Sequence, residues 1–575
     1  MASPCSLLNI SLNSIVHNHV QLLSDVRLLP GNLQCDIYRQ MYDCGHLKPL
    51  ETELTCFENV TKLLRANEKR LLLYKPLQYL HDNGINVAVT LYEEYSCQVR
   101  QFMKMEDWDV CKKMIPMGIS LGNLFLEMGW FYKADNMFYC ILQLCKALTP
   151  TPYKMILLCH TRLLHIRTGN CQFSAAKDSY EQAVELASQL ESSSCIPVSW
   201  IPISLGKCQL LFAMNHYREA YQDCLKLLTN VNSQLSVKVI IDILRISSKA
   251  CVVKRKYRKA EYLITHAVEL AKQHFGDQHR TYADSLVDYG FYLLNVDSVD
   301  SAVKIYQNVL DILQNLFGEN NLCVAMVHED LGYASYVQEY SSGEFENARH
   351  HAQMAIDIIS RHLPEDHLLL ASSKRVKALV LEEIAIDRDL EEEKLDEAQN
   401  LHLASLLLAR QAFGEDNVQI AKHFGNLGRL YQSMKRYGEA EKMHQRAIEI
   451  KERLLGIEDY EVALSLGHLA SLYTYDMNMF DKAEELYIRS IAIGRKLFGD
   501  GYSGLEYDYR GLIHLYKSTG NYEAMLNYSH ILERWHDLRE NRAASELNLT
   551  VKNHQKPTEK IIQEFFTLEV ELNGL

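Results

Sequence analysis

Charged residues recur at matching places along the middle and end of this chain, where they could hold another peptide. The first group combines carboxylates with one phenol: Asp284, Asp288, Glu329, Asp330 and Tyr333. The second group, later in the chain, is basic or amide: Lys422, Asn426, Arg429 and Arg510. Carboxylates bind Arg or Lys side chains through charge-assisted hydrogen bonds, and cations bind a free C-terminal carboxylate. This pattern favours peptide recognition, with Asn426 bonding the peptide backbone, unless the charges pair with one another across neighbouring helices or are solvated.

A near-constant spacing of turns predicts how these residues are positioned. An apolar residue followed by Gly or Pro precedes each helix-forming stretch: Phe275-Gly276, Phe317-Gly318, Leu363-Pro364, Phe413-Gly414, Leu455-Gly456 and Phe498-Gly499. The step is 42 residues from Gly276 to Gly318 and again from Gly414 to Gly456, and 43 from there to Gly499. A fixed period in this range indicates stacked supersecondary units, which present a long surface instead of closing one core.

The residues within each period fit the tetratricopeptide pattern of two antiparallel helices. In one copy, a large-small pair is followed by aromatic and small residues: Leu427-Gly428, Tyr431, Tyr437, Ala440, His444 and Ala447. Two helices can cross closely only where one presents a small residue and a larger neighbour fills the space beside it. We therefore predict an all-α fold, a right-handed α-solenoid of tetratricopeptide-type helix pairs. The first helix of each pair should line a concave groove, and the charged residues named above occupy its groove-facing positions.

Composition places limits on the class of protein. Of 575 residues, 60 are Lys or Arg and 73 are Asp or Glu, so the formal charge of -13 has the wrong sign for a broad nucleic-acid surface. Fifteen Cys without a CxxC pair are typical of a reducing compartment. Neither a secretory signal nor an apolar run of the roughly 18 residues needed to span a membrane is evident. We expect a soluble cytoplasmic protein, with nuclear, cytoskeletal or membrane association left open.

The sequence lacks the motifs of common enzymes. It contains no Gly-rich phosphate loop, no HExxH and no GxSxG. His350-His351 is expected to be a surface pair and not a metal site. We therefore expect a non-catalytic protein without cofactor or metal, in four parts: residues 1–55, degenerate helical repeats at 56–240, regular repeats at 241–535 and a partly disordered tail at 536–575.

The first 33 residues do not follow the repeat and carry two short motifs of their own. Leu7, Ser11 and Ile15 would lie at i, i+4 and i+8 on one helix face, an arrangement that usually means ordinary core packing. This stripe also resembles the box through which substrate receptors bind elongin C, with Ser11 in place of the commoner Cys. Further on, Leu29-Pro30-Gly31-Asn32-Leu33 resembles the apolar-Pro-x-x-apolar signature of receptors that dock on cullin-2, through Leu29, Pro30 and Leu33.

Two family resemblances extend these observations. The 42-residue units between Lys256 and Tyr528 resemble the repeats of kinesin light chain. Nearly the whole chain is similar to the amyloid protein-binding protein 2 family, most closely at Lys249–Arg255, Asp288–Asp297, Leu363–Leu379 and Gly499–Leu512. The resemblance implies a substrate receptor of a cullin-2 RING E3 ubiquitin ligase, with elongin C, elongin B and cullin-2 as partners. It also implies substrates that end in C-terminal degrons of the form Arg-x-x-Gly.

A second hypothesis is a cargo adaptor linked to kinesin and microtubules that carries the amyloid precursor protein by its tail. A light chain would begin with a long heptad coil, which is not visible here, so the segment from Ser6 to Leu33 favours the ligase receptor. Homo-oligomerisation is a further option, because solenoid receptors often pair.

Overall fold

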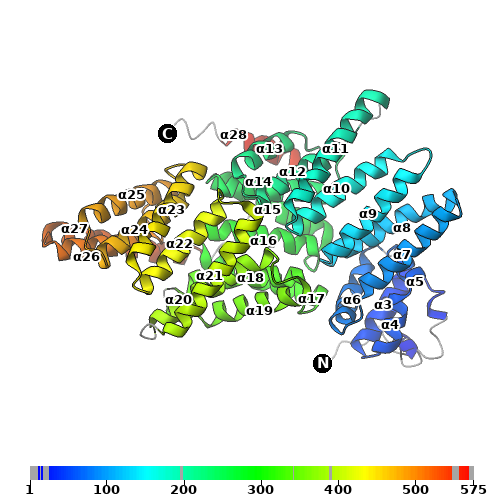
Figure 1. Cartoon of the computed structure of the whole chain (residues 1–575), viewed down its shortest axis with the longest axis horizontal. Helices are drawn as coiled ribbons and strands as arrows, with labels where there is room; N and C mark the ends of the chain where they lie inside the picture. Colours follow the sequence, from blue (N-terminus) through cyan, green and yellow to red (C-terminus); the bar gives the residue numbers. More distant parts are fainter. Residues whose placement is uncertain are drawn as a thin grey trace. The chain divides into compact units, whose positions relative to one another are not determined.

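The fold is built of helices throughout the part of the chain that the structure describes. The computed structural model covers residues 11–12, 14–16, 25–65, 67–194, 198–232, 234–340, 342–387, 391–546 and 556–568. Within these ranges every regular element is a helix and no strand occurs. Successive helices pair as antiparallel hairpins and the hairpins stack in chain order, which confirms the predicted all-α repeat fold (Figure 1).

The chain divides into two compact units. The first holds residues 1–213, 277–283 and 310–324, and the second holds residues 214–276, 284–309 and 325–575. The four-part division drawn from the sequence stays a prediction. Up to residue 213 the helices are α3 (Gly31–Asp43), α4 (Leu47–Thr55), α5 (Phe57–Leu63), the 3-10 helix η1 (Asn67–Leu73), α6 (Tyr74–Asp82), α7 (Val87–Lys104), α8 (Trp108–Glu127), α9 (Phe131–Ala147), α10 (Tyr153–Gly169), α11 (Phe173–Ser194) and α12 (Ile201–Ala213).

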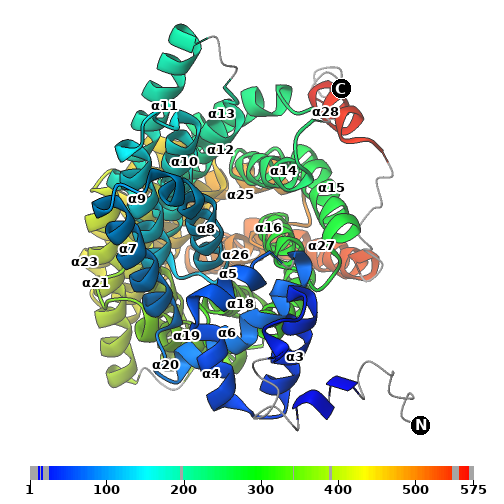
Figure 2. The ribbon, with the colours of Figure 1, turned by 90° about the vertical axis from the view of Figure 1, so that its right-hand side faces the viewer.

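The remaining helices carry the regular repeats and lie mostly in the second unit. They are α13 (Tyr217–Thr229), α14 (Val237–Val253), α15 (Tyr257–Phe275), α16 (Arg280–Asn295), α17 (Val299–Phe317), α18 (Leu322–Glu339), α19 (Glu346–His362), α20 (Leu369–Asp387), α21 (Glu392–Phe413), α22 (Val418–Ser433), α23 (Tyr437–Leu455), α24 (Tyr460–Tyr475), α25 (Phe480–Phe498), α26 (Leu505–Ser518), α27 (Tyr522–Glu546) and α28 (Thr558–Thr567). The last of these packs against α15 (Figure 2).

The hairpins form because a small residue lets two helices approach closely. A Cβ placed on Gly428 of α22 would lie 2.7 Å from the ring of His444 on α23, so only glycine fits there. Between hairpins, Gly456 ends α23 with φ 103, in the left-handed region that glycine adopts without strain. The predicted large-small pairing and the predicted turns are therefore both present in the structure.

Apolar side chains connect one hairpin to the next. A single cluster of buried residues runs from Leu406 on α21 to Trp535 on α27 and includes Tyr487 and Leu512. Burying a side chain of this size contributes roughly 1.5–3 kcal/mol, so each hairpin gains most of its stability from its neighbours. None of the described helices is both long enough and apolar enough to cross a lipid bilayer.

Three histidines are buried in this stack on consecutive helices. His402 on α21, His423 on α22 and His444 on α23 are at most 3% exposed. Both ring nitrogens of His402 and His444, and Nδ1 of His423, lack hydrogen-bond partners among the described residues. Burial lowers the pKa of His423 and of His444 to about 3, and holds the pKa of His402 well below 6.5.

These histidines make stability depend on pH. The unfolded chain takes up protons near the ordinary pKa of 6.5, whereas the folded chain does not until far lower pH, so their contribution is complete above 6.5 and is lost as pH falls. We expect the free energy of unfolding, measured by urea denaturation, to decrease from about pH 7 to about pH 5, and His444→Gln to reduce that slope. His530→Gln, at an exposed position, should leave it unchanged. A pH-independent free energy in the wild type would contradict this assignment.

Candidate functional site

One polar face of the second unit is built from the first helix of each hairpin. Ion pairs link these helices in succession: Arg245 Nε on α14 lies 2.8 Å from Asp288 Oδ2 on α16, and Lys422 Nζ on α22 lies 2.8 Å from Glu461 Oε1 on α24. We call this surface the inner face. Its charged and aromatic members are Arg245, Lys249, Asp284, Asp288, Glu329, Asp330, Tyr333, Tyr336, Arg375, Glu382, Glu383, Lys422, Arg429, Glu461 and Tyr507.

The predicted acidic group meets two cations at one end of the inner face. Asp288 is buried and lies 3.2 Å from Lys249 Nζ in addition to its contact with Arg245, while Asp284 Oδ2 is 3.9 Å from Arg245 Nη1. Burial raises the pKa of Asp288, but the charges of Lys249 and Arg245 outweigh burial and hold it below its usual value. Asp288 is therefore ionised and already neutralised by its own chain.

The other two acids of this group, on α18, are less well compensated. Burial and the neighbouring charge of Glu329 raise the pKa of Asp330 to about 8, with Asp288 acting in the same direction and Lys249 opposing them. Burial also raises the pKa of Glu329, against the effect of the Ser372 hydroxyl and the Arg375 charge. Asp330 has no cation within 4.0 Å among the described residues. This end of the inner face can therefore accept an additional cation, because a cation would favour the ionised carboxylates.

The three cations assigned to the carboxylate end each pair with a carboxylate of this chain. Lys422 shares Glu461 with Lys451, whose Nζ is 3.1 Å from Glu461 Oε2. The guanidinium of Arg429 pairs with Glu383, lies 3.5 Å from Glu382 and donates to the hydroxyl of Tyr336 at 3.2 Å.

Arg510 and Asn426 complete this assigned group. Arg510 is exposed on α26 and pairs with Glu506 one helical turn away, at 2.6 Å. Asn426 Nδ2 is buried and has no hydrogen-bond partner among the described residues, so its amide can still donate to a peptide carbonyl.

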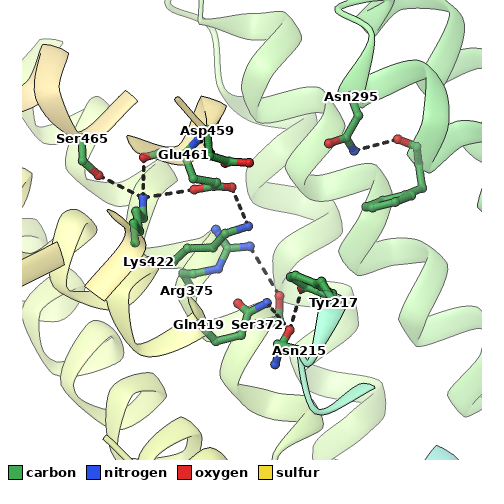
Figure 3. Close-up of polar contacts among 12 residues, drawn as sticks. Asn215, Tyr217, Asn295, Ser372, Arg375, Gln419, Lys422, Asp459, Glu461 and Ser465 are labelled. Carbon is green, nitrogen blue, oxygen red and sulfur yellow. Dashed lines mark hydrogen bonds and ion pairs between the residues drawn. The ribbon is translucent and has the colours of Figure 1, made fainter. Parts of the chain in front are cut away.

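A cation that the sequence analysis missed lies between the two ends. Arg375 on α20 has its guanidinium carbon 5.2 Å from the ring centroid of Tyr333, and its one hydrogen bond within the described structure is to Ser372 Oγ at 3.5 Å. No described carboxylate lies within 4.0 Å of it. Figure 3 shows Arg375 beside Lys422 and Glu461. Its repeat begins at Pro364, which stands in place of a turn glycine and follows Gly318 by 46 residues instead of 42, so the regular spacing did not identify Arg375.

The inner face curves, so helices distant in sequence approach each other. Lys422 on α22 lies near Tyr217 on α13, where its charge opposes the burial that raises the phenol's pKa. In the same way the charge of Arg429 opposes the burial that raises the pKa of Tyr507 on α26. Groups on the inner face are therefore surrounded by protein although several of their side chains remain partly exposed to water.

The amino-terminal motifs are placed in part. Leu7 lies outside the described residues, Ser11 is exposed and Ile15 is half-buried. Leu29 is half-buried, and its carbonyl accepts from Gln34 Nε2 at 2.8 Å and from Lys62 Nζ at 2.9 Å. Pro30 begins α3 and is exposed, as are Leu33 at 37% and the neighbouring Leu28 at 83%.

An ion pair between the exposed Arg27 and the buried Glu53 shapes this turn. Arg27 donates to both oxygens of Glu53, at 2.9 and 3.0 Å, and Tyr38 Oη donates to Glu53 at 2.8 Å. These bonds hold the chain before α3 so that Leu28 and Leu33 face solvent. Large apolar side chains held outward at one place are typical of a protein-docking surface.

Known proteins share both the repeats and the length of this chain. Tetratricopeptide-repeat models match residues 377–453 and 462–501. Amyloid protein-binding protein 2 of Mus musculus is 49% identical over 567 residues, which is 98% of this chain and 97% of the mouse protein. The Rattus norvegicus protein is 50% identical over the same shares. The chain belongs to the amyloid protein-binding protein 2 family.

Two solved structures among those similar to this chain have low sequence identity to it. A Rap protein complexed with competence and sporulation factor covers 69% of this chain and matches over 100% of its own, at 14% identity and a TM-score of 0.39. BtubC from P. vanneervenii covers 46% of this chain and 94% of its own, at 17% identity and a TM-score of 0.30. Membership of the amyloid protein-binding protein 2 family rests on the sequence relatives alone.

The raised pKa of Asp330 predicts a second pH effect. Below about pH 8 folded Asp330 holds its proton, whereas the unfolded chain releases that proton near pH 3.8. The contribution of Asp330 to stability is therefore lost as the pH rises from 3.8 toward the folded pKa. Relative to wild type, we expect Asp330→Asn to gain on the order of 1 kcal/mol in free energy of unfolding between about pH 5 and about pH 8. Asp109→Asn, at an exposed site, serves as the control. An equal pH profile for wild type and Asp330→Asn would show that Asp330 is ionised at neutral pH.

Proposed function

We propose that this chain is the substrate-recognition subunit of a cullin-2 RING E3 ubiquitin ligase. The inner face would hold substrate C-termini of the form Arg-x-x-Gly, and the amino-terminal segment would dock on elongin C and cullin-2. The observation that carries the proposal is a carboxyl group and a guanidinium on neighbouring first helices that form no ion pair within the described residues. Asp330 on α18 has no cation within 4.0 Å, and Arg375 on α20 has no carboxylate within 4.0 Å.

The degron arginine would bind at the acidic end. Asp330 and Glu329 can both accept hydrogen bonds from a guanidinium, which would replace the proton that Asp330 holds at neutral pH. Asp288 and Asp284 add negative charge close by, although Arg245 and Lys249 already offset much of it. Tyr333 would contact the aliphatic part of the side chain.

The terminal carboxylate would bind at Arg375. Lys422, Arg429 and Arg510 would each have to give up a carboxylate of this chain before accepting one from a peptide. Arg375 has none to release, and its guanidinium is held by Tyr333 and Ser372. Three residues of extended chain span roughly 10 Å. Packed helices lie about 8–10 Å apart, so one Arg-x-x-Gly segment can bridge from α18 to α20.

Peptide binding tests both ends separately. We expect a peptide ending Arg-Ala-Ala-Gly to bind about tenfold more weakly when its C-terminus is amidated, as measured by isothermal titration calorimetry. In Arg375→Gln the free acid and the amide should bind equally, whereas Arg510→Gln should keep the difference. Loss of the difference in Arg510→Gln alone would move the carboxylate site to α26.

The acidic end is tested by the matching substitutions. Asp330→Asn should weaken binding of the arginine peptide but not of a peptide with Ala at that position, and added salt should have the same direction of effect. If Arg→Ala in the peptide leaves the affinity for wild type unchanged, the arginine site is refuted.

Docking on the ligase would use the exposed apolar residues at the start of α3. Pro30 and Leu33 project from the turn that Arg27, Glu53 and Lys62 hold in place. The stripe that includes Ser11 and Ile15 would meet elongin C. Such a subunit needs no catalytic residue, because positioning a substrate near the transferring enzyme is sufficient.

Substitution at this surface separates docking from peptide binding. We expect Leu33→Asp to abolish co-purification of cullin-2 while elongin C, the melting temperature and peptide affinity remain unchanged. Leu538→Asp changes a leucine of similar exposure on α27 and should have no effect. Retention of cullin-2 by Leu33→Asp would remove the docking assignment.

A second candidate is cargo binding. The relatives carry the name amyloid protein-binding protein, which favours an adaptor that holds the amyloid precursor protein for microtubule-linked transport. The two functions differ in the partners they need. Co-purification of kinesin in the absence of cullin-2 would favour the adaptor.

A further inference from the structure

Three turns of the second unit contact helices that lie about five hairpins further along the chain. Each contact joins the turn between the two helices of one hairpin to the start of a later first helix. The sequence separations are nearly constant, at 203 residues for Met214 and Asn417, 204 for Arg255 and Asp459, and 206 for Asp297 and Ser503. We call this row of contacts the seam. Its regular spacing shows that five hairpins complete one full coil of the superhelix, so that each of these hairpins contacts the one five positions further along the chain.

The middle contact of the seam is a buried ion pair. Arg255 donates from Nη2 to Asp459 Oδ1 at 3.0 Å and from Nε to Oδ2 at 3.3 Å, and the two side chains are 13% and 9% exposed. The guanidinium also lies 5.3 Å from the ring centroid of Tyr460. Asp459 additionally accepts from the backbone N–H of Glu461 at 2.9 Å, so the same carboxylate begins α24 and closes the seam.

The outer two contacts repeat this arrangement with hydrogen bonds. Asp297 accepts from the backbone N–H of Ser503 at 3.0 Å, from its hydroxyl at 2.5 Å and from Arg539 Nη1 at 2.7 Å. At the other contact, Asn417 Nδ2 donates to the carbonyl of Met214 at 3.1 Å, and Gln419 donates to Asn215 at 3.2 Å.

The three seam contacts are made from hairpin turns that share one backbone conformation. Asn215, Arg255 and Asp297 occupy equivalent turns and all have positive φ, at 65, 58 and 66. Non-glycine residues seldom adopt this conformation, which costs roughly 1–2 kcal/mol per residue. The same conformation recurs at Glu106, Cys171, Lys435 and Asn478, which lie in the turns of other hairpins, so it is a general property of the hairpin turn from which the seam contacts are made.

A seam of this kind limits how a peptide can reach the inner face. In an open solenoid, an internal segment of a protein can enter sideways between the ends of the trough. Here successive coils are joined along the side at the turns α12–α13, α14–α15 and α16–α17, so access lies along the coil axis. A chain entering along the axis must lead with a free end.

We propose that the seam restricts the inner face to chain ends and excludes internal segments of the same sequence. This inference rests on the proposed peptide-binding function and adds the physical origin of its preference for termini. The preference would have two separable components. One is the carboxylate contact described above, and the other is steric and independent of charge.

The experiment compares two ligands of the same recognition sequence, one with a free chain end and one whose two ends are both joined to folded domains. The first ligand is a peptide with the sequence Arg-Ala-Ala-Gly and a C-terminal amide, which has a free end but no carboxylate. The second carries the same sequence joined at both sides, through short flexible linkers, to small folded domains. We expect the full-length protein to bind the amide at least about tenfold more tightly than the doubly blocked ligand. Equal affinities would overturn the inference.

Opening the seam should remove this discrimination. The variant Arg255→Ala, Asp459→Asn, Asp297→Asn loses both ion pairs but keeps the cap on α24, because Asn can accept from Glu461 N–H. We expect it to bind the two ligands within about threefold of each other. The control Arg453→Ala, Asp416→Asn removes an exposed ion pair and should discriminate like wild type. Unchanged discrimination in a folded seam variant would overturn the inference.

A locked variant tests the same point if the seam variant does not fold. Arg255→Cys with Asp459→Cys, joined by a short bis-maleimide cross-linker that takes the place of the ion pair, should bind the amide peptide with the association rate of the form without cross-linker. Loss of binding on cross-linking would show that peptides enter through an opened seam, which contradicts the proposal. If neither the acid nor the amide peptide binds wild type, the proposed function itself fails, an outcome distinct from equal binding of free and blocked ligands.

Discussion

Each helix pair in this protein can bury its apolar side only against the next pair, and the remaining structure follows from that constraint. Gly428 allows α22 and α23 to approach until His444 covers the glycine, and the paired helices then offer one continuous apolar side to their neighbours. Because the contacts are between neighbours, stability is distributed along the stack. Small changes in the angle between pairs add up, so the angle decides how the stack curves.

That curvature closes the coil on itself after five pairs. The closing contacts are charged and hydrogen-bonded, with Arg255, Asp459 and Asp297 withdrawn from water. Burying such a pair costs desolvation energy that its attraction roughly offsets, so its contribution is to specify register more than to add stability. A purely apolar seam could slide by part of a repeat, whereas a bidentate ion pair at one turn has a single matching position.

Charged groups on the inner face hold neighbouring first helices together and do not set the register between coils. Most of its carboxylates and cations pair within the chain, as Lys422 does with Glu461 and Arg429 with Glu383, and these pairs hold the first helices in place. Glu329, Asp330 and Arg375 form no ion pair in the described part of this surface, and protein surrounds them. Ionisable groups without partners in such surroundings are a source of binding energy for a ligand that supplies the opposite charge.

The sequence by itself determined the helices, the pairing of Gly428 with a large residue on the next helix and the glycine turns, because each depends on residues within about one repeat. It also placed Asp288, Asp330 and Lys422 on one side of their helices through the period of the helix. Tertiary structure alone decided which of these charges remain available. Glu461 meets Lys422 across adjacent first helices, and Arg375 lies in a repeat whose spacing departs from 42 residues. Asp459 meets Arg255 only because the repeats curve by a particular angle. Such pairings depend on geometry accumulated over several repeats, and no local pattern of residues encodes it.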